Sequence, residues 1–221
     1  MWTTFEPRLD VLPEAQLQVW PLLAFTLAQE FVLYGETAVV LHLGHRVSVD
    51  FDFFRSEPLE KRQLDVALRG FPDCEVVQDD RDTLVVRTQL PAGAVKISFF
   101  GGLGFPRINP PLLTTDRVSL VASREDLLAT KLKAVLDRAE AKDYRDIAAL
   151  LGAGVSLGRG LAGFAQIFRR DPALPLRALG FFNDGDLATL PDSDRRLLRA
   201  ARDSITEIPD LSVLSGPLAA P

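Results

Sequence analysis

The chain has 221 residues, of which 47% are hydrophobic and 25% charged, and it carries a net charge of −5. This balance is ordinary for one large or two small folded domains, and it excludes a generally basic nucleic-acid-binding chain, so any such partner would need a local basic patch. A single cysteine, Cys74, excludes an intrachain disulfide. Because no secretory signal or bilayer-spanning segment is recognisable near the N-terminus, we expect a cytoplasmic protein with no membrane partner.

The first half of the chain predicts an α/β core. Short apolar runs alternate with turn residues, and β-rich runs recur at close spacing. The expected elements are a helix at 12–28 with Pro21 at its start or at a kink, a strand at 30–34, a helix at 37–43, a strand at 48–54, a helix at 58–68, and strands at 75–77, 83–88 and 95–100.

The second half predicts helices. Residues 101–111 form the clearest loop, whose glycines we interpret as a flexible turn rather than a phosphate-binding loop. Ser123 and Asp126 have the capping-box spacing, which predicts a helix running to about residue 139.

A further helix is predicted at 142–151, followed by short helices broken by Gly and Pro and a loosely attached tail from Pro209. We therefore expect an α/β core at 1–115 and a helical domain at 116–221.

The strongest chemical signal is a pair of aspartates, Asp50 and Asp52, in a predicted strand. Side chains alternate between the faces of a strand, so Ser48, Asp50 and Asp52 share one face. The opposite, buried face is expected to carry Val47, Val49, Phe51 and Phe53. Neighbouring carboxylates repel unless a cation lies between them, which favours Mg²⁺ bound together with substrate phosphates. The alternative is an edge strand with a solvated acidic face. The glycine turn at Gly35 favours the metal site, because a turn leading into a helix N-terminus can bind phosphate.

Several segments together resemble a known family. Tyr34-Gly35-Glu36-Thr37-Ala38 and His45-Arg46-x-Ser48-x-Asp50-x-Asp52-Phe53-Phe54 resemble the AbiEii/AbiGii toxin family of nucleotidyltransferases, part of the polymerase-beta-like nucleotidyltransferase superfamily. Val95-Lys96-Ile97-Ser98-Phe99-Phe100 resembles its later core strand, and Lys131-Leu132-Lys133-Ala134 with Lys142-Asp143-Tyr144-Arg145-Asp146-Ile147 resembles its helical motifs. The resemblance covers residues 20 to 155. It implies an α/β (α+β) fold with a nucleotidyltransferase-type mixed sheet, flanking helices and a helical C-terminal half.

The resemblance also implies roles for individual residues. Gly35 and Thr37 would cradle phosphate, and Asp50 and Asp52 would bind Mg²⁺. The nucleotide-binding set it suggests is Gly35, Glu36, Thr37, Arg46, Ser48 and Lys131, and the catalytic set is Asp50, Asp52, Lys131, Asp143 and Asp146. Both sets are expected to face one cleft.

The spacing of the helical motif also allows a different interpretation. Asp143 and Asp146 lie three residues apart, on one helix face, and Lys142 could pair with Asp146. Without the resemblance, this pattern is typical of a salt-bridged surface helix. With it, Lys131 is expected to reach a phosphate while Asp143 or Asp146 orients it or contacts the nucleotide.

Two residues depart from the family pattern. Glu36 stands where the family usually has a second glycine, and it could repel phosphate, turn outward, or meet Arg46 or a lysine. Ser98 stands where the superfamily commonly supplies a third carboxylate. Because a serine cannot replace a carboxylate base or ligand, we expect nucleotide binding with weakened catalysis.

The leading hypothesis is a metal-dependent nucleotidyltransferase that uses an NTP and an RNA acceptor such as tRNA, as the toxin of a toxin–antitoxin pair with a cognate antitoxin. The alternative is a catalytically degenerate module of the same fold that binds nucleotide, nucleic acid or a protein. A phosphatase of the haloacid dehalogenase type is disfavoured, because Phe53 and Phe54 follow Asp52. The arginines of a late predicted helix, interpreted as a self-compensating face rather than an RNA contact, are Arg195, Arg196, Arg199 and Arg202.

Overall fold

A computed structural model describes all residues from 1 to 221 and divides them into two compact units. The first unit contains Met1–Gly104, Pro110–Ala122 and Gly216–Pro221. The second contains Phe105–Asn109 and Ser123–Ser215. The chain therefore passes between the units more than once.

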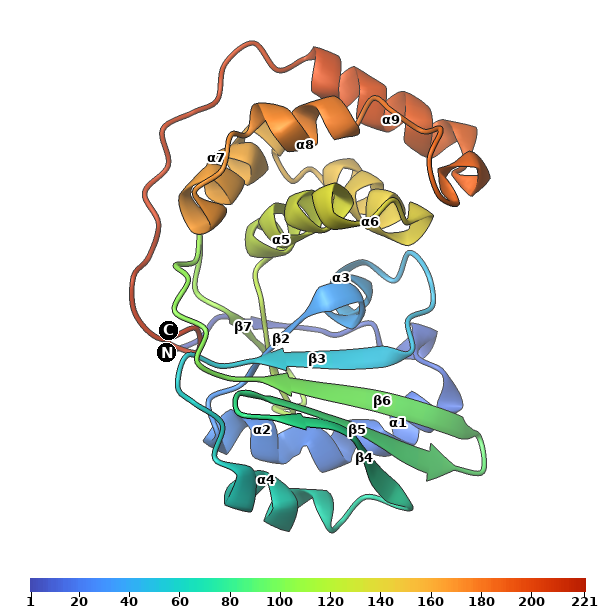
Figure 1. The fold of residues 1–221 in the computed structure, drawn as a ribbon, viewed down its shortest axis with the longest axis vertical. Coiled ribbons are helices and arrows are strands. Elements are labelled where there is room, and N and C mark those ends of the chain that lie inside the picture. Colours follow the sequence, from blue (N-terminus) through green and yellow to red (C-terminus); the bar gives the residue numbers. More distant parts are fainter. The chain divides into compact units, whose positions relative to one another are not determined.

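The first unit is built on an eight-stranded mixed sheet, with the strand order β1-β7-β8-β2-β3-β6-β5-β4 (Figure 1). The strands are β1 (Thr4–Phe5), β2 (Val32–Tyr34), β3 (Asp50–Phe54), β4 (Cys74–Asp80), β5 (Thr83–Leu90), β6 (Gly93–Phe100), β7 (Leu112–Thr114) and β8 (Leu120–Val121). At its centre, β3 pairs antiparallel with β2 and parallel with β6. The predicted β-rich runs are confirmed as the antiparallel meander β4-β5-β6.

Helices cover both faces of this sheet, with α3 on one face and α1 and α2 on the other (Figure 1). The helical segments are η1 (Leu9–Val11), α1 (Glu14–Val19), η2 (Trp20–Ala24), α2 (Phe25–Ala28), α3 (Gly35–Leu43) and α4 (Lys61–Leu68). The single helix predicted at 12–28 is thus divided into three pieces. Pro21 near the start of the η2 turn accounts for the division, because its nitrogen cannot donate the next helical hydrogen bond.

An aromatic core fixes the central strands. Phe51, Phe53 and Phe99 are fully buried on one face of β3 and β6, and the rings of Phe53 and Phe99 stack 5.6 Å apart. Trp20, from the helical layer, lies 6.0 Å from Phe51. Since these aromatic side chains all occupy one face, the residues between them must point to the other face.

The predicted start of the acidic strand is wrong. Strand β3 begins at Asp50, and Val47 and Val49 lie before it with exposed fractions of 59% and 56%. Ser48, expected on the polar face, is instead 3% exposed. The physical reason is that residues before Asp50 belong to the connection from α3, so strand alternation does not apply to them.

The glycine loop after β6 behaves as the turn that was predicted. The N–H of Gly101 donates to the carbonyl of Asp82 at 3.0 Å, and the N–H of Gly102 donates to the carbonyl of Glu57 at 2.9 Å. These groups are satisfied within the unit, so they are not available to cradle a phosphate.

The prediction of a loosely attached tail is wrong for its last residues. Leu218 and Ala219 are 1% and 6% exposed. The N–H of Leu218 donates to Ser56 Oγ at 2.9 Å, and Trp2 Nε1 donates to the carbonyl of Ala219 at 2.9 Å. Apolar burial and these two hydrogen bonds attach the C-terminus to the first unit.

The second unit is helical. Its elements are α5 (Arg124–Asp137), α6 (Ala141–Gly152), α7 (Leu157–Phe168), α8 (Ala173–Ala178), η3 (Leu187–Thr189) and α9 (Asp192–Asp203). The helices α6, α7 and α8 pack against α5, and α9 packs against α6. None of the helices in either unit combines the length and apolar character that a bilayer span requires.

The capping motif predicted at Ser123 is confirmed. Ser123 Oγ accepts a hydrogen bond from the N–H of Asp126 at 3.1 Å. The carboxylate of Asp126 in turn accepts from the N–H groups of Ile108 and Asn109, at 2.6 and 3.1 Å. These bonds explain why residues 105–109 belong to the helical unit although the sheet surrounds them in sequence.

Candidate functional site

The turn at Gly35 lies directly against the carboxylate of Asp52. Strand β2 runs into α3 without a loop, and Gly35 has φ +73°, a left-handed conformation that favours glycine. A Cβ at Gly35 would come within 2.6 Å of Asp52 Oδ2. Because the first N–H groups of a helix have no partner within it, this turn sets donors of the kind that can bind an anion next to an acidic side chain.

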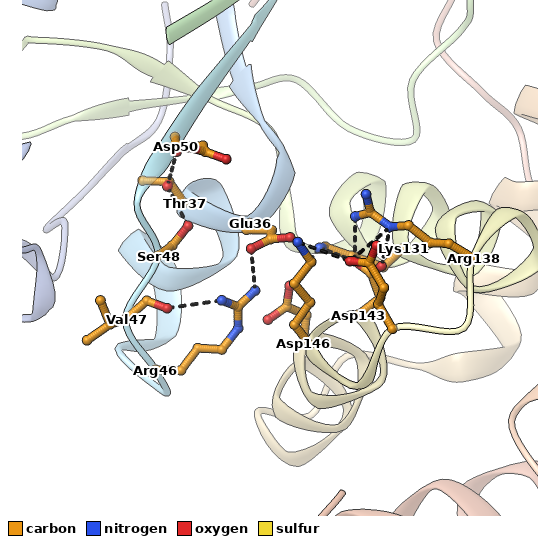
Figure 2. A network of polar contacts seen from close by, with 12 residues as sticks. Glu36, Thr37, Arg46, Val47, Ser48, Asp50, Lys131, Arg138, Asp143 and Asp146 are labelled. Carbon is orange, nitrogen blue, oxygen red and sulfur yellow. Dashed lines mark hydrogen bonds and ion pairs between the residues drawn. The ribbon is translucent and has the colours of Figure 1, made fainter. Parts of the chain in front are cut away.

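The side chains of Thr37 and Ser48 fix the connection between α3 and β3. Thr37 is fully buried, and its hydroxyl lies 2.8 Å from Ser48 Oγ and donates to the carbonyl of Asp50, as Figure 2 shows. These contacts hold the start of the acidic strand against the first turn of the helix. Both hydroxyls therefore have a positioning role in this structure, and their predicted contact with the nucleotide stays a prediction.

The polar face of β3 and β6 carries Asp50, Asp52, Lys96 and Ser98. The parallel register pairs Asp50 with Lys96 and Asp52 with Ser98. Lys96 Nζ lies 2.9 Å from Asp50 Oδ2, with both side chains partly exposed. Ser98 is therefore the residue directly beside Asp52 on the neighbouring strand, at the position where the family resemblance implies a third carboxylate.

Asp52 is the electrostatically perturbed member of the pair. Burial is the largest cause and raises its pKa, and the negative charges of Asp50 and Glu36 raise it further. A hydrogen bond from Ser98 and the charge of Lys96 act in the opposite direction but do not compensate. The carboxylate at the centre of this site is thus poorly stabilised by the protein alone, which is typical of functional sites.

Glu36, the residue that departs from the family glycine, is paired with Arg46. Arg46 Nη2 lies 3.1 Å from Glu36 Oε2, and Arg46 Nη1 donates to the carbonyl of Val47 at 3.0 Å (Figure 2). This is one of the outcomes expected from the sequence. The pair keeps the Glu36 carboxylate beside a cation, which reduces its repulsion of a phosphate at Gly35.

The donor set around Asp50 and Asp52 fits one hard divalent cation. No cluster of three or more His, Cys, Asp or Glu side chains with metal-binding geometry is present. Mg²⁺, however, is commonly held by one or two carboxylates with the remaining positions filled by water and substrate phosphates. Two carboxylates one residue apart, one of them insufficiently compensated, meet that requirement.

The second unit contains a charge cluster, formed by Lys131, Arg138, Asp143 and Asp146 (Figure 2). Lys131 Nζ lies 2.7 Å from Asp143 Oδ1 and 2.7 Å from Asp146 Oδ2, and Arg138 Nε lies 2.8 Å from Asp143 Oδ2. Burial by itself would raise the pKa of Asp143, but the hydrogen bond from Arg138 and the charge of Lys131 outweigh it, and the pKa is lowered.

The interpretation of this segment as a surface helix is wrong for its two aspartates. The side chains of Asp143 and Asp146 are 0% exposed, and that of Lys131 is 5% exposed. Lys142 Nζ lies 3.0 Å from Glu140 Oε2. The structure brings together the three residues that the family motif predicted in this unit; their contact with a nucleotide stays a prediction.

Sequence reasoning missed Lys96 as a member of the acidic site. Alternation puts Lys96 on the same face of its strand as Ser98, but only the parallel register of β3 and β6 brings it to Asp50. Three of the four arginines of α9 are engaged locally: Arg195 contacts Asp192 and the carbonyl of Leu187, Arg199 lies over the ring of Phe182, and Arg202 pairs with Asp203. These contacts agree with a self-compensating face.

Comparison with known proteins connects this geometry to a family. The family described as "Nucleotidyl transferase AbiEii toxin, Type IV TA system" matches residues 22–213. An uncharacterized protein from Aquifex aeolicus (strain VF5) is 27% identical over 123 residues, 55% of this chain, and the chain spans 57% of that protein's length.

Two solved structures share the fold. A nucleotidyltransferase candidate from H. pylori has a TM-score of 0.57 at 18% identity, covering 86% of this chain and 93% of that chain. MenT4, a nucleotidyltransferase toxin from Mycobacterium tuberculosis H37Rv, has a TM-score of 0.57 at 15% identity, covering 86% and 83%. These likenesses confirm the predicted fold class, a mixed sheet with flanking helices and a helical C-terminal half.

Proposed function

The chain belongs to the AbiEii family of nucleotidyltransferase toxins, and on this basis we propose that it transfers a nucleotide from an NTP to an RNA acceptor, with a tRNA-like molecule as the expected class. The observation that carries the proposal is the contact between the Gly35 turn and the carboxylate of Asp52. A glycine turn at a helix N-terminus and a carboxylate lie side by side here, and these are the two groups that would hold the phosphates and the metal of a metal-bound triphosphate.

The transfer has a simple balance. An acceptor hydroxyl oxygen forms a bond to the α-phosphorus of the NTP, the bond from that phosphorus to the bridging oxygen breaks, pyrophosphate leaves, and the hydroxyl proton passes to solvent water. The N–H groups at the start of α3 would bind the phosphates, and Asp50 and Asp52 would hold Mg²⁺. When bound, the cation neutralises charge that develops on the phosphate oxygens.

The hydroxyl proton is the weak point of this reaction in the present chain. Ser98, beside Asp52, cannot accept it as a carboxylate would, and Glu36 is engaged by Arg46. General-base assistance is worth about 10²–10⁴-fold in rate. We therefore expect NTP binding with slow transfer.

The cluster in the second unit is proposed to serve the nucleotide through Lys131. Its ammonium is held between the carboxylates of Asp143 and Asp146, which fixes the position of the charge. By family resemblance this charge would meet a phosphate, while the two aspartates orient it. The family description also supports a cognate antitoxin as partner.

The test is a transfer assay with each of the four labelled NTPs, Mg²⁺ and total RNA. The wild type is expected to label RNA slowly, and Asp52→Asn is expected to lose labelling. Asp65→Asn is the matched control, because Asp65 is an exposed carboxylate of the same unit. Labelling that persists in Asp52→Asn, or that is equally strong without divalent cation, would refute the proposal.

A second candidate function is supported by Ser98 alone. If this residue has removed catalysis while Asp50 and Asp52 remain, the chain is a nucleotide-binding module. Equilibrium binding of a labelled NTP with Mg²⁺, measured beside the transfer assay, distinguishes the two: binding without transfer by the wild type, with transfer gained in Ser98→Asp, would favour the module. Absence of binding would refute both.

A further inference from the structure

The neighbour of Asp50 on the next strand is Lys96, and its ammonium forms an ion pair with one carboxylate oxygen of Asp50. Strands β3 and β6 are parallel, and their register sets Lys96 directly beside Asp50. Lys96 Nζ lies 2.9 Å from Asp50 Oδ2, and the two side chains are 45% and 38% exposed. This contact places a fixed positive charge within the proposed metal site, on the same face as Asp52.

The remaining charges of the site leave Asp52 without a cationic partner. Glu36 is paired with Arg46, and Asp50 is paired with Lys96. Asp52 receives a hydrogen bond from the neutral hydroxyl of Ser98. The carboxylates available to a metal are therefore Asp50, already engaged on one oxygen, and Asp52.

A site for two divalent cations has different requirements. The ions in such sites lie about 3.5–4 Å apart, so carboxylates must bridge them and offset four positive charges. Here the position that could supply a third carboxylate is Ser98, and a lysine adds a positive charge beside Asp50. The site therefore has too few carboxylates, and too little negative charge, to hold a second divalent cation.

We propose that this site takes one divalent cation and that the Lys96 ammonium replaces a second ion as the fixed positive charge beside Asp50. The inference rests on the proposed metal-dependent function and deepens it. Lys96 is thereby a positioning residue: it holds the Asp50 carboxylate and adds a charge that needs no free metal.

The experiment counts Mn²⁺ ions by electron paramagnetic resonance, with and without a non-hydrolysable NTP, after subtracting the Mn²⁺–nucleotide complex measured without protein. The wild type is expected to bind one ion per chain. Lys96→Ala is expected to lower the Kd for Mn²⁺ by about three- to tenfold, because a competing charge is removed. The double variant Lys96→Ala/Ser98→Asp is expected to bind two ions.

Lys61→Ala is the matched control, because Lys61 also pairs with an aspartate of the first unit, Asp79, at 2.7 Å. Its Mn²⁺ stoichiometry and Kd should equal those of the wild type. Two ions in the wild type, or an unchanged Kd in Lys96→Ala, would overturn this inference and leave the proposed function standing. No Mn²⁺ bound by the wild type would overturn both. Since Lys96 is partly exposed, the single variant tests the inference even if the buried Ser98→Asp change prevents folding.

Discussion

Gly35→Ala should disable the site through a geometric conflict with Asp52. The added Cβ would lie 2.6 Å from Asp52 Oδ2, whereas ordinary contact begins at 3.4 Å, so the carboxylate must move by about 0.8 Å. A misplacement near 1 Å can cost about 10²-fold in rate. The left-handed backbone at φ +73° adds strain of about 1–2 kcal/mol for a residue with a side chain.

These two effects can be separated by a second glycine. Gly154 also has a positive φ, +86°, but no atom lies within 4 Å of a Cβ added there. Gly154→Ala should therefore show the strain without the conflict. Both variants should lose roughly 2–8 °C in Tm by calorimetry, given about 2–4 °C per kcal/mol for a chain of this size.

Only Gly35→Ala should lose nucleotide transfer, by about 10²-fold, and weaken Mn²⁺ binding. The assays are the RNA-labelling rate and the Mn²⁺ titration, both below the Tm of each variant. Equal transfer rates and equal Mn²⁺ affinities in the two variants would refute the reasoning. That outcome would mean that the contact between Gly35 and Asp52 has no part in function.

Three further changes test the charges and the tail. Asp52→Asn should raise Tm at pH 7.5 without metal. Burial and neighbouring charges raise the pKa of Asp52 above its ordinary value of 3.8, so ionisation of this side chain destabilises the folded state as pH rises through the raised pKa. The gain in Tm should therefore vanish below pH 3.8, where the carboxyl is protonated in both the folded and the unfolded state. A lower Tm at pH 7.5 would contradict this. Lys131→Met should cost about 3–5 kcal/mol in urea unfolding, since it removes a buried cation that both Asp143 and Asp146 contact. Lys133→Met, which removes an exposed pair on the same helix, should cost less than about 1 kcal/mol; equal costs would refute the distinction. Leu218→Ala should cost about 2–5 kcal/mol because this side chain is 1% exposed. Leu214→Ala, at 39% exposure, should change the free energy of unfolding by no more than about 0.5 kcal/mol in the same measurement. An equally small change in Leu218→Ala would show that Leu218 does not anchor the tail.

Much of the fold could be predicted because local patterns and tertiary contacts agree. Alternation gave the polar and apolar faces of β3 correctly from Asp50 onward, and the capping box marked the start of α5. The motifs indicated the AbiEii family, and the match to that family over residues 22–213 confirms it. Where the prediction failed, the cause was contact between distant segments. Val47 and Val49 fit a strand pattern, but the connection from α3 takes them out of the sheet.

The site was less predictable for the same reason. Nothing local indicates that Lys96 meets Asp50, because the contact depends on the parallel register of β3 and β6. The burial of Asp143 and Asp146 depends on Lys131, which lies on the preceding helix. The tail from Pro209 has the composition of a loose segment, and only tertiary contacts, which bury Leu218 and Ala219, attach its end.

The two charge clusters of this chain solve opposite problems. Around Asp143 and Asp146, two cations meet two buried carboxylates, and the pKa of Asp143 is lowered, so the ionised cluster stabilises the folded unit at neutral pH and loses that contribution in acid. Around Asp52, burial and the charges of Asp50 and Glu36 raise the pKa of the carboxyl, so its ionised form destabilises the protein. Such a destabilising charge is typical of a functional site, where a bound ligand can offset the free energy that it costs the fold. The acidic strand is therefore where a metal and its nucleotide are expected, and the buried cluster is where the chain fixes the position of Lys131.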